Sequence, residues 1–206
     1  SRRDRVLSHV FVQVFDHALL RMLWHNHSRV APDVFRANHP NHRRLKRYAD
    51  RGLRHVLNLR GDSEKAHYLF EAESCAALGL DLHGFKMSAK KLPKQWALLS
   101  LLDLLDRIDG PMLIHCKSGA DRSGLVAAIV QIHRHGVSVA EAREQLSLWR
   151  LHFKWTQAGV NDFLLHEFAR DGEGRMPFRA WVAAYYDRDV MMARFARLSL
   201  RERLSL

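Results

Sequence analysis

The sequence predicts an α/β protein with a central sheet of four or five strands flanked by helices, and with extra N- and C-terminal helices. Short apolar runs typical of buried strands alternate with longer amphipathic stretches, and the last part of the chain is helical in pattern. The 206 residues fit one domain with an added helical arm. With 47% hydrophobic and 27% charged residues, the composition argues against disorder, collagen or a coiled coil.

The chain opens with an expected amphipathic helix over residues 5–24, where apolar residues recur at steps of three and four. This helix can pack on the domain or lie on a membrane surface, with its arginines at the lipid headgroups. The longest apolar run is only a few residues, so we expect no transmembrane span. The predicted parts are an N-terminal helical arm over 1–29, a main domain over 30–170 and a C-terminal helical extension over 171–206 packed on the core.

Helix ends are expected at prolines and glycines, because proline fits the first helical turn and glycine the position after the last. Pro40 thus opens a basic helix that Gly52 ends, and Pro93 opens another. Ser138 and Glu141 have the spacing of a capping box. The expected strands cover 55–59, 80–87 and 111–115, and the expected helices cover 41–51, 63–78, 93–110, 123–135, 156–170 and 177–198.

Basic residues exceed acidic ones by 33 to 22, which gives a net charge of +11. Residues 1–60 carry most of the excess, with 13 basic and 4 acidic side chains. They form either a solvated basic face or a patch for an anionic partner such as a membrane surface or a polyphosphorylated substrate. We find no nucleic-acid-binding motif and expect no nucleic-acid partner.

The two cysteines, Cys75 and Cys116, are too few for a disulfide framework. They indicate a reducing compartment or a reactive thiol, so we expect a cytoplasmic protein, with association to a membrane as an option. The first residues lack the apolar core of a signal peptide, and a periplasmic location would require a leader that has been removed. We expect a monomer.

Residues 115–124 carry the chemistry. Cys116 ends an apolar strand, and Arg122 lies six residues later at the start of a helix. Backbone N–H groups between them can surround one phosphate, while the helix presents its positive end to the same point. Gly119 permits a backbone conformation that other residues resist, and the planar guanidinium of Arg122 can bind two phosphate oxygens. The alternative is a buried structural cysteine in a tight turn.

The same positive surroundings should lower the pKa of Cys116. Free thiols have a pKa near ~8.5, whereas thiols at helix N-termini beside cations fall to roughly 3.5–7.5. Cys116 would then be a thiolate nucleophile. Ser123 is placed to donate a hydrogen bond to the sulfur and help it leave when a phosphocysteine is hydrolysed.

The run of His115, Cys116, five residues, Arg122 and Ser123 resembles the signature of the protein-tyrosine/dual-specificity phosphatase superfamily. The residues of 34–40 and 56–61 are similar to segments of compact bacterial dual-specificity-like phosphatases, and the resemblance covers about 30–165. It implies a phosphocysteine intermediate with no metal and no cofactor. It also implies that Cys116 is the nucleophile, that Arg122 binds phosphate, and that His115 supports the loop. The backbone donors would come from Lys117, Ser118, Gly119, Ala120 and Asp121.

The general acid departs from this pattern. The superfamily usually has an Asp about thirty residues before the cysteine, but residues 84–91 contain no carboxylate. Asp121 is the first candidate, because a bound dianion raises the pKa of a neighbouring carboxylate, and myotubularin-type lipid phosphatases are similar at this position. Asp121 could instead only order the loop. Asp62 is the alternative general acid, and Asp33 and Asp81 are weaker candidates.

Other residues have two interpretations each. Four lysines could surround the pocket mouth or merely be solvated: Lys86, Lys90, Lys91 and Lys117. Cys75 is either a buried thiol or a redox partner of Cys116. Histidine pairs such as His39 and His42 lack carboxylate or cysteine companions at ligand spacing, so we expect no metal site. His152 follows the signature helix and could support the site.

The predicted function is a cysteine-dependent phosphatase that hydrolyses phosphomonoesters on phosphoprotein or on membrane phospholipid or glycolipid. A catalytically weak phosphate-binding module is the alternative, because the upstream Asp is missing. A sulfurtransferase is disfavoured, because Arg122 and Ser123 lie at phosphatase spacing. The C-terminal apolar stripe is expected to pack on the core, with membrane contact as the other option.

Overall fold

The computed structural model describes residues 24–206. The amphipathic helix expected over 5–24 therefore lies outside the described residues, apart from its last position. The described chain divides into two compact units. The first contains Asp33–Lys86 and Gly110–Gly119 with the described residues up to Arg29, and the second contains Val30–Pro32, Met87–Asp109 and Ala120–Leu206.

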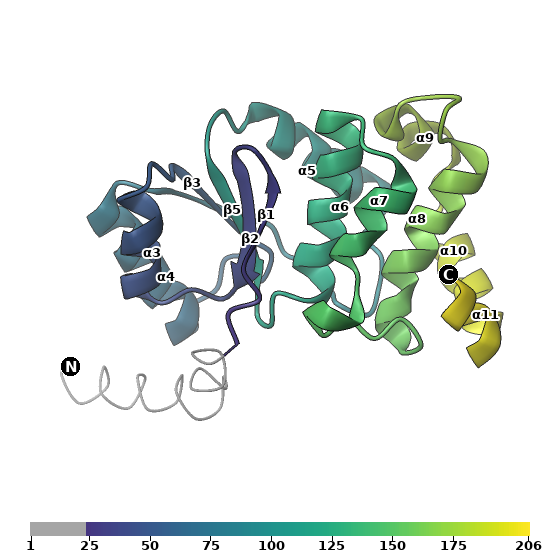
Figure 1. Cartoon of the computed structure of the whole chain (residues 1–206), viewed down its shortest axis with the longest axis horizontal. Coiled ribbons are helices and arrows are strands. Elements are labelled where there is room, and N and C mark those ends of the chain that lie inside the picture. Colours follow the sequence, from purple (N-terminus) through teal and green to yellow (C-terminus); the bar gives the residue numbers. More distant parts are fainter. Residues whose placement is uncertain (1–23) are drawn as a thin grey trace. The chain divides into compact units, whose positions relative to one another are not determined.

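The described residues form a five-stranded sheet of order β1-β2-β5-β3-β4 (Figure 1). The strands are β1 (Ser28–Ala31), β2 (Val34–Asn38), β3 (His55–Asn58), β4 (Asp81–Gly84) and β5 (Met112–Cys116). The pairs β2–β5, β5–β3 and β3–β4 are parallel. A two-residue turn joins β1 to β2. The chain is thus an α/β protein, as expected from the alternation of strand and helix patterns.

The register of the sheet positions the candidate loop. Asn38 at the end of β2 pairs with Cys116 at the end of β5, and Asn58 at the end of β3 pairs with His115. The carboxyl ends of these three parallel strands therefore share one edge, which is the edge where open α/β sheets bind ligands. All five residues of β5 are buried, in agreement with its continuous apolar run in the middle of the sheet.

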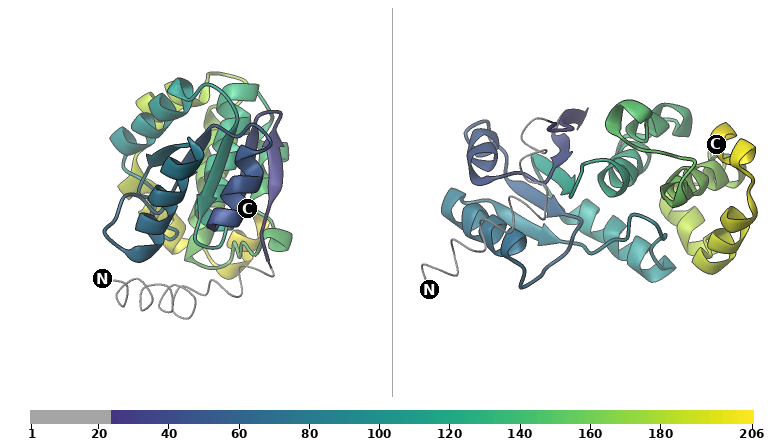
Figure 2. Two further views of the ribbon diagram at one scale, coloured as in Figure 1. Left: turned by 90° about the vertical axis from the view of Figure 1, so that its left-hand side faces the viewer. Right: turned by 90° about the horizontal axis from the view of Figure 1, so that it is seen from below.

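Helices α3 (His42–Ala49) and α4 (Ala66–Leu78) lie side by side and pack on the sheet of the first unit (Figure 2). Asn41 caps α3 by accepting a hydrogen bond from the Arg44 amide, and Gly79 ends α4 in the left-handed conformation. The buried cluster between helices and sheet consists of Ala37, Leu45, Leu53, Val56, Cys75, Leu80 and Leu113.

The second unit is built around α6 (Asp121–His135), in which eight consecutive residues from Ser123 to Val130 are buried. A helix that is buried all round belongs to the interior of its unit. Gly136 ends α6, as expected. The other helices of this unit are α5 (Gln95–Arg107), α7 (Val139–Ala142), α8 (Val160–Asp171), α9 (Phe178–Tyr185), α10 (Arg188–Arg197) and α11 (Leu200–Ser205).

The C-terminal helices pack on this unit through an aromatic cluster. Trp181 of α9 is buried, and its ring lies 5.4 Å from that of Phe168 in α8. The Gln95 side chain at the start of α5 donates to the carbonyl of Val182, and the hydroxyl of Tyr186 donates to the carbonyl of Pro93. The apolar stripe of the C-terminal region is therefore accounted for by packing within the unit.

Several expected boundaries were wrong. The helix expected over 177–198 is two helices, because Asp187 caps a new helix by accepting from the amides of Asp189 and Val190. The strand expected over 80–87 is limited to Asp81–Gly84, and the helix expected over 63–78 begins at Ala66. Helix α8 begins at Val160 after a short 3₁₀ turn, instead of at 156. These ends depend on local caps and turns that hydrophobic spacing does not report. None of the described helices has the length and apolar character to cross a membrane.

Candidate active site

Strand β5 brings His115 and Cys116 to the carboxyl edge of the sheet, where both are buried. The chain then turns through Lys117 and Ser118 to Gly119. The amide of Gly119 donates a hydrogen bond to the Cys116 sulfur at 3.3 Å. A backbone donor directed at the sulfur favours negative charge on it.

Three consecutive carbonyls of this loop are held by donors from the same unit. The His39 amide donates to the carbonyl of Lys117 at 3.3 Å, and the Asn26 side chain donates to that of Ser118 at 3.4 Å. The buried guanidinium of Arg36 donates to the carbonyl of Gly119 at 2.5 Å. In a trans peptide the N–H points away from the carbonyl of the same plane, so fixing the carbonyls orients the amides that follow them toward the opposite side. Carbonyls that are held in this way are compatible with an anion-binding nest.

Gly119 is required by the geometry of the loop. Its φ is +75°, in the left-handed region that favours glycine. A Cβ at this position would lie 2.6 Å from the Asn38 nitrogen and 2.8 Å from the Ala37 carbonyl carbon, both of them backbone atoms of β2. The conformational role expected for Gly119 is therefore present, and close contact with the neighbouring strand adds to it.

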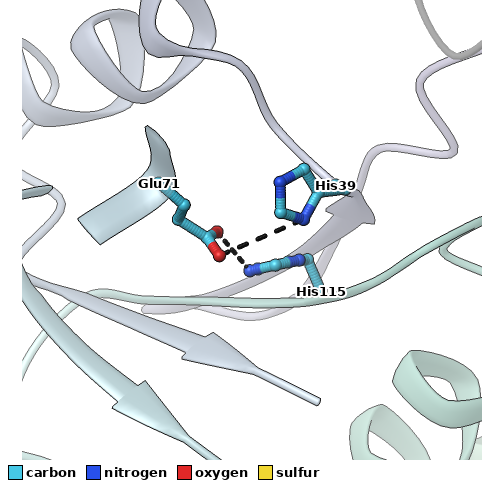
Figure 3. Close-up of side chains that lie close together, drawn as sticks. All are labelled: His39, Glu71 and His115. Carbon is cyan, nitrogen blue, oxygen red and sulfur yellow. Dashed lines mark ion pairs between the residues drawn. The ribbon is translucent and has the colours of Figure 1, made fainter. Parts of the chain in front are cut away.

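The buried side chain of Glu71 lies beside His39 and His115 (Figure 3). It reaches from α4 toward the ring of His115, where Oε1 lies 2.6 Å from Nε2. The Asn58 side chain donates to the second oxygen at 2.6 Å, and His39 Nδ1 lies 4.0 Å from that oxygen. Glu71 thus joins the ends of β3 and β5 to α4. Glu71 was not predicted from the sequence. The one indication was its position among the apolar residues of its helix, where an acidic side chain is unusual.

Donor atoms of His39, Glu71 and His115 lie within 4.8 Å of one another, the spacing at which a metal ion could be held. The carboxylate of this cluster comes from α4, far from both histidines in the sequence, so pairs of histidines that are neighbours in the chain do not reveal it. His115 Nε2 and Glu71 Oε1 are in ion-pair contact at 2.6 Å, and the Asn58 side chain donates to the other carboxylate oxygen. The cluster therefore links His115 to α4 through Glu71.

The second half of the signature belongs to the second unit, where Asp121 and Arg122 begin α6. The chain runs to them directly from Gly119 through Ala120. Arg122 donates from Nη1 to the carbonyl of Met87 at 3.5 Å, and Ser123 is buried in the first helical turn. A guanidinium at the positive end of a helix is suited to hold an anion.

Asp121 is bound to a buried histidine. Its Oδ1 lies 2.7 Å from His152 Nδ1, and Asp162 of α8 lies 2.6 Å from His152 Nε2. Burial lowers the pKa of His152, but the hydrogen bonds and charges of the two carboxylates outweigh it and raise the pKa to about 9. His152 is therefore an imidazolium at neutral pH. The supporting role expected for His152 thus has a definite partner, whereas Asp162 was not anticipated.

The model of the tyrosine phosphatase family matches residues 25–144, more than half of the chain. The chain belongs to the tyrosine phosphatase family. It is accordingly a phosphatase that hydrolyses phosphomonoesters, of the protein-tyrosine/dual-specificity type. The matched residues include Glu71 and the loop from His115 to Ser123, whereas His152 and Asp162 lie beyond the match.

Solved structures share the fold of this phosphatase at low identity. A DUF442 protein from Shewanella putrefaciens CN-32 is 17% identical with a TM-score of 0.58, covering 71% of this chain and 90% of that one. Tk-PTP in its active form is 22% identical with a TM-score of 0.54, covering 72% and 99%. The core catalytic domain of the PP-IP phosphatase SIW14 from S. cerevisiae is 18% identical with a TM-score of 0.51, covering 83% and 90%. A search among curated proteins finds no match.

The other acid candidates of the phosphatase lie in the first unit. Asp62 is exposed, its carboxylate lies against Gly84, and it forms a hydrogen bond with Tyr68. Asp33 precedes β2 and Asp81 begins β4, so both lie at the amino edge of the parallel strands. Cys116 lies at the carboxyl edge, and this placement disfavours Asp33 and Asp81 as general acids.

The remaining candidates are placed as follows. Cys75 is buried in α4, where burial and the neighbouring Glu71 raise its pKa to about 12, so it stays a protonated thiol. This favours the interpretation of Cys75 as a packing residue. Lys86, Lys90 and Lys91 are exposed, and Lys117 is half-buried.

Proposed function

We propose that this phosphatase works through a covalent phosphocysteine on Cys116. The observation that carries the proposal is the loop in which the carbonyls of residues 117–119 are all engaged and the Gly119 amide is directed at the sulfur. A loop held in this way offers its amides to an oxyanion without reorganising when the substrate arrives.

In the first step the Cys116 thiolate attacks phosphorus, the S–P bond forms and the P–O ester bond breaks. Arg122 holds two oxygens of the transferring group, and the loop amides bind the others. Asp121 gives its proton to the leaving oxygen. In the second step water attacks phosphorus, Asp121 takes up its proton, and the S–P bond breaks to release phosphate. Ser123 donates a hydrogen bond to the sulfur as it leaves.

His152 supplies the proton that Asp121 needs. The contact at 2.7 Å supports this role, because an imidazolium adjoining Asp121 lets the pair carry a proton at neutral pH. Asp162 fixes the ring from its other nitrogen. The bound dianion repels the Asp121 carboxylate and draws the shared proton toward it.

The test of the proposal is turnover of p-nitrophenyl phosphate. We expect the wild-type protein to release nitrophenol and Cys116→Ser to release none while still binding vanadate or phosphate. Wild-type turnover in Cys116→Ser would contradict the cysteine mechanism. Phosphate binding without turnover in the wild type would instead support a binding module, which the lack of a carboxylate in residues 84–91 favours.

Two matched variants test the general acid. We expect Asp121→Asn to lower kcat by roughly 10²–10⁴-fold and to remove the basic limb of its pH profile, because a proton donor contributes about that much. Asp62→Asn is the control and should keep kcat near the wild-type value. The reverse pattern would move the acid role to Asp62.

A further inference from the structure

Between α7 and α8 lies a stretch of chain in which several large apolar side chains are exposed. We define Leu148–Trp155 as the aromatic segment (Figure 1). Trp149 is 87% exposed, which leaves nearly the whole indole ring in solvent. The exposed apolar residues of the aromatic segment are Leu148, Trp149, Leu151, Phe153 and Trp155.

This exposure is fixed by the fold. His152, in the middle of the segment, is buried and bound to Asp121 and Asp162, so the residues on either side of it face outward. Tight turns hold both flanks: the Leu151 amide donates to the Leu148 carbonyl at 2.8 Å, and the Thr156 amide donates to the Phe153 carbonyl at 3.0 Å. Leu151 has a φ of +61°, a strained conformation that persists only where surrounding structure enforces it.

Cations are interleaved with these apolar side chains. Arg150 and Lys154 lie within the segment itself. A second group, Lys90 and Lys91, follows Met87, whose carbonyl is bound by Arg122. The aromatic segment and the residues after Met87 are thus anchored to consecutive residues at the start of α6. Within the described residues Lys90, Lys91 and Lys154 form no ion pair, so their charges are available to an anionic partner.

We propose that the aromatic segment docks on an anionic lipid surface and brings the phosphatase to phosphomonoester headgroups of membrane lipids. Indole and phenyl rings with neighbouring Lys and Arg are the side chains favoured at the boundary between headgroups and acyl chains. Protein–protein interfaces also favour aromatic residues and Arg, but their cores are depleted in Lys, so the lysines favour a lipid occupant over a protein. The proposal that the segment docks on lipid depends only on the exposed side chains of this surface. The proposal that the substrate is a lipid depends also on the proposed function.

The first measurement is co-sedimentation with vesicles of phosphatidylcholine, with and without phosphatidylglycerol. We expect the wild type to bind the anionic vesicles, and Trp149→Ala to bind roughly tenfold more weakly, because a large apolar side chain no longer enters the bilayer boundary. Lys90→Ala and Lys91→Ala should each weaken binding about fivefold and only on anionic vesicles. Failure of the wild type to bind, or undiminished binding by Trp149→Ala, would overturn the proposal.

The chain offers a matched control. Leu148 and Leu151 are 56% and 45% exposed, and Leu200 and Leu204 on α11 are 61% and 47% exposed. We expect the double change Leu148→Ala with Leu151→Ala to reduce vesicle binding, and Leu200→Ala with Leu204→Ala to leave it unchanged. Equal losses in the two pairs would show that the C-terminal surface contributes equally, and would overturn the assignment to the aromatic segment. A wild-type dimer that dissociates in Trp149→Ala would overturn it in favour of a second copy.

Two substrates separate this inference from the proposed function. We expect Trp149→Ala to hydrolyse p-nitrophenyl phosphate at the wild-type rate but vesicle-embedded phosphatidic acid several-fold more slowly. Vesicle binding without hydrolysis of either substrate would sink the proposed function and leave the docking surface standing. If the wild type hydrolyses p-nitrophenyl phosphate but does not bind vesicles, the phosphatase activity stands and the docking surface is overturned.

Discussion

At the scale of single residues, the candidate loop depends on contacts that each involve one or two atoms. Arg36, Asn26 and the His39 backbone bind three carbonyls of the loop, and Glu71 binds the histidine that precedes the cysteine. Arg36 and Glu71 are buried charges, and a buried charge is costly unless it is paired. Arg36 donates to the Gly119 carbonyl and Glu71 contacts His115, so both side chains hold the loop from within the first unit.

Gly119→Ala tests how tightly the loop is packed. We expect a loss of about 3 kcal/mol or more in the free energy of unfolding, together with loss of turnover, because alanine resists a positive φ and its Cβ would meet the backbone of β2. Gly174→Ala is the control, since Gly174 has a φ of +73° and open space around it. It should cost only about 1–2 kcal/mol. Equal losses in urea denaturation would show that the close contact has no effect.

His152 should make stability depend on pH. Its pKa is raised from 6.5 to about 9 in the folded chain, so its contribution is fully present below pH 6.5 and is lost as the pH rises through about 9. On the order of 3 kcal/mol should disappear over this interval. Chemical denaturation of the wild type against His152→Gln measures it, and parallel pH profiles for the two proteins would contradict the paired imidazolium.

At the scale of elements, apolar periodicity predicted whether a segment is a strand or a helix. The residue at which each helix begins or ends depends instead on its capping residues. Gly79 and Gly136 marked helix ends correctly, because both glycines adopt the left-handed conformation after the last helical residue. The helix expected to open at Pro40 begins instead at His42, where the Asn41 side chain caps it. The break at Asp187 was missed, since the apolar stripe continues across it and only the side-chain cap reveals a second helix.

The importance of that cap can be measured. Asp187→Ala should lower the free energy of unfolding by about 1 kcal/mol, because the amides of Asp189 and Val190 lose their acceptor at the start of α10. Asp187→Asn keeps an oxygen acceptor and should stay within a few tenths of a kcal/mol of the wild type. A loss in Asp187→Asn as large as in Asp187→Ala would mean that charge, and not the capping hydrogen bond, matters.

At the scale of the whole molecule, the fold class and the family were within reach of the sequence because both depend on local patterns. The run from His115 to Ser123 lies within one strand, turn and helix, so its residue types and spacing, together with the apolar strand before it and the helix after it, identify it. The partners that hold it come from elsewhere: Glu71 from α4, and Asp162 from α8. Pairings over such sequence separations depend on the tertiary fold, which residue spacing does not encode.

The central claim is that Cys116 becomes phosphorylated during turnover. The direct measurement is mass spectrometry of peptides from protein quenched in acid during hydrolysis of p-nitrophenyl phosphate. We expect phosphate on the peptide that contains Cys116 in the wild type, more of it in Ser123→Ala because the sulfur leaves more slowly, and none in Cys116→Ser. Steady turnover by the wild type with no phosphate on Cys116 would contradict the account.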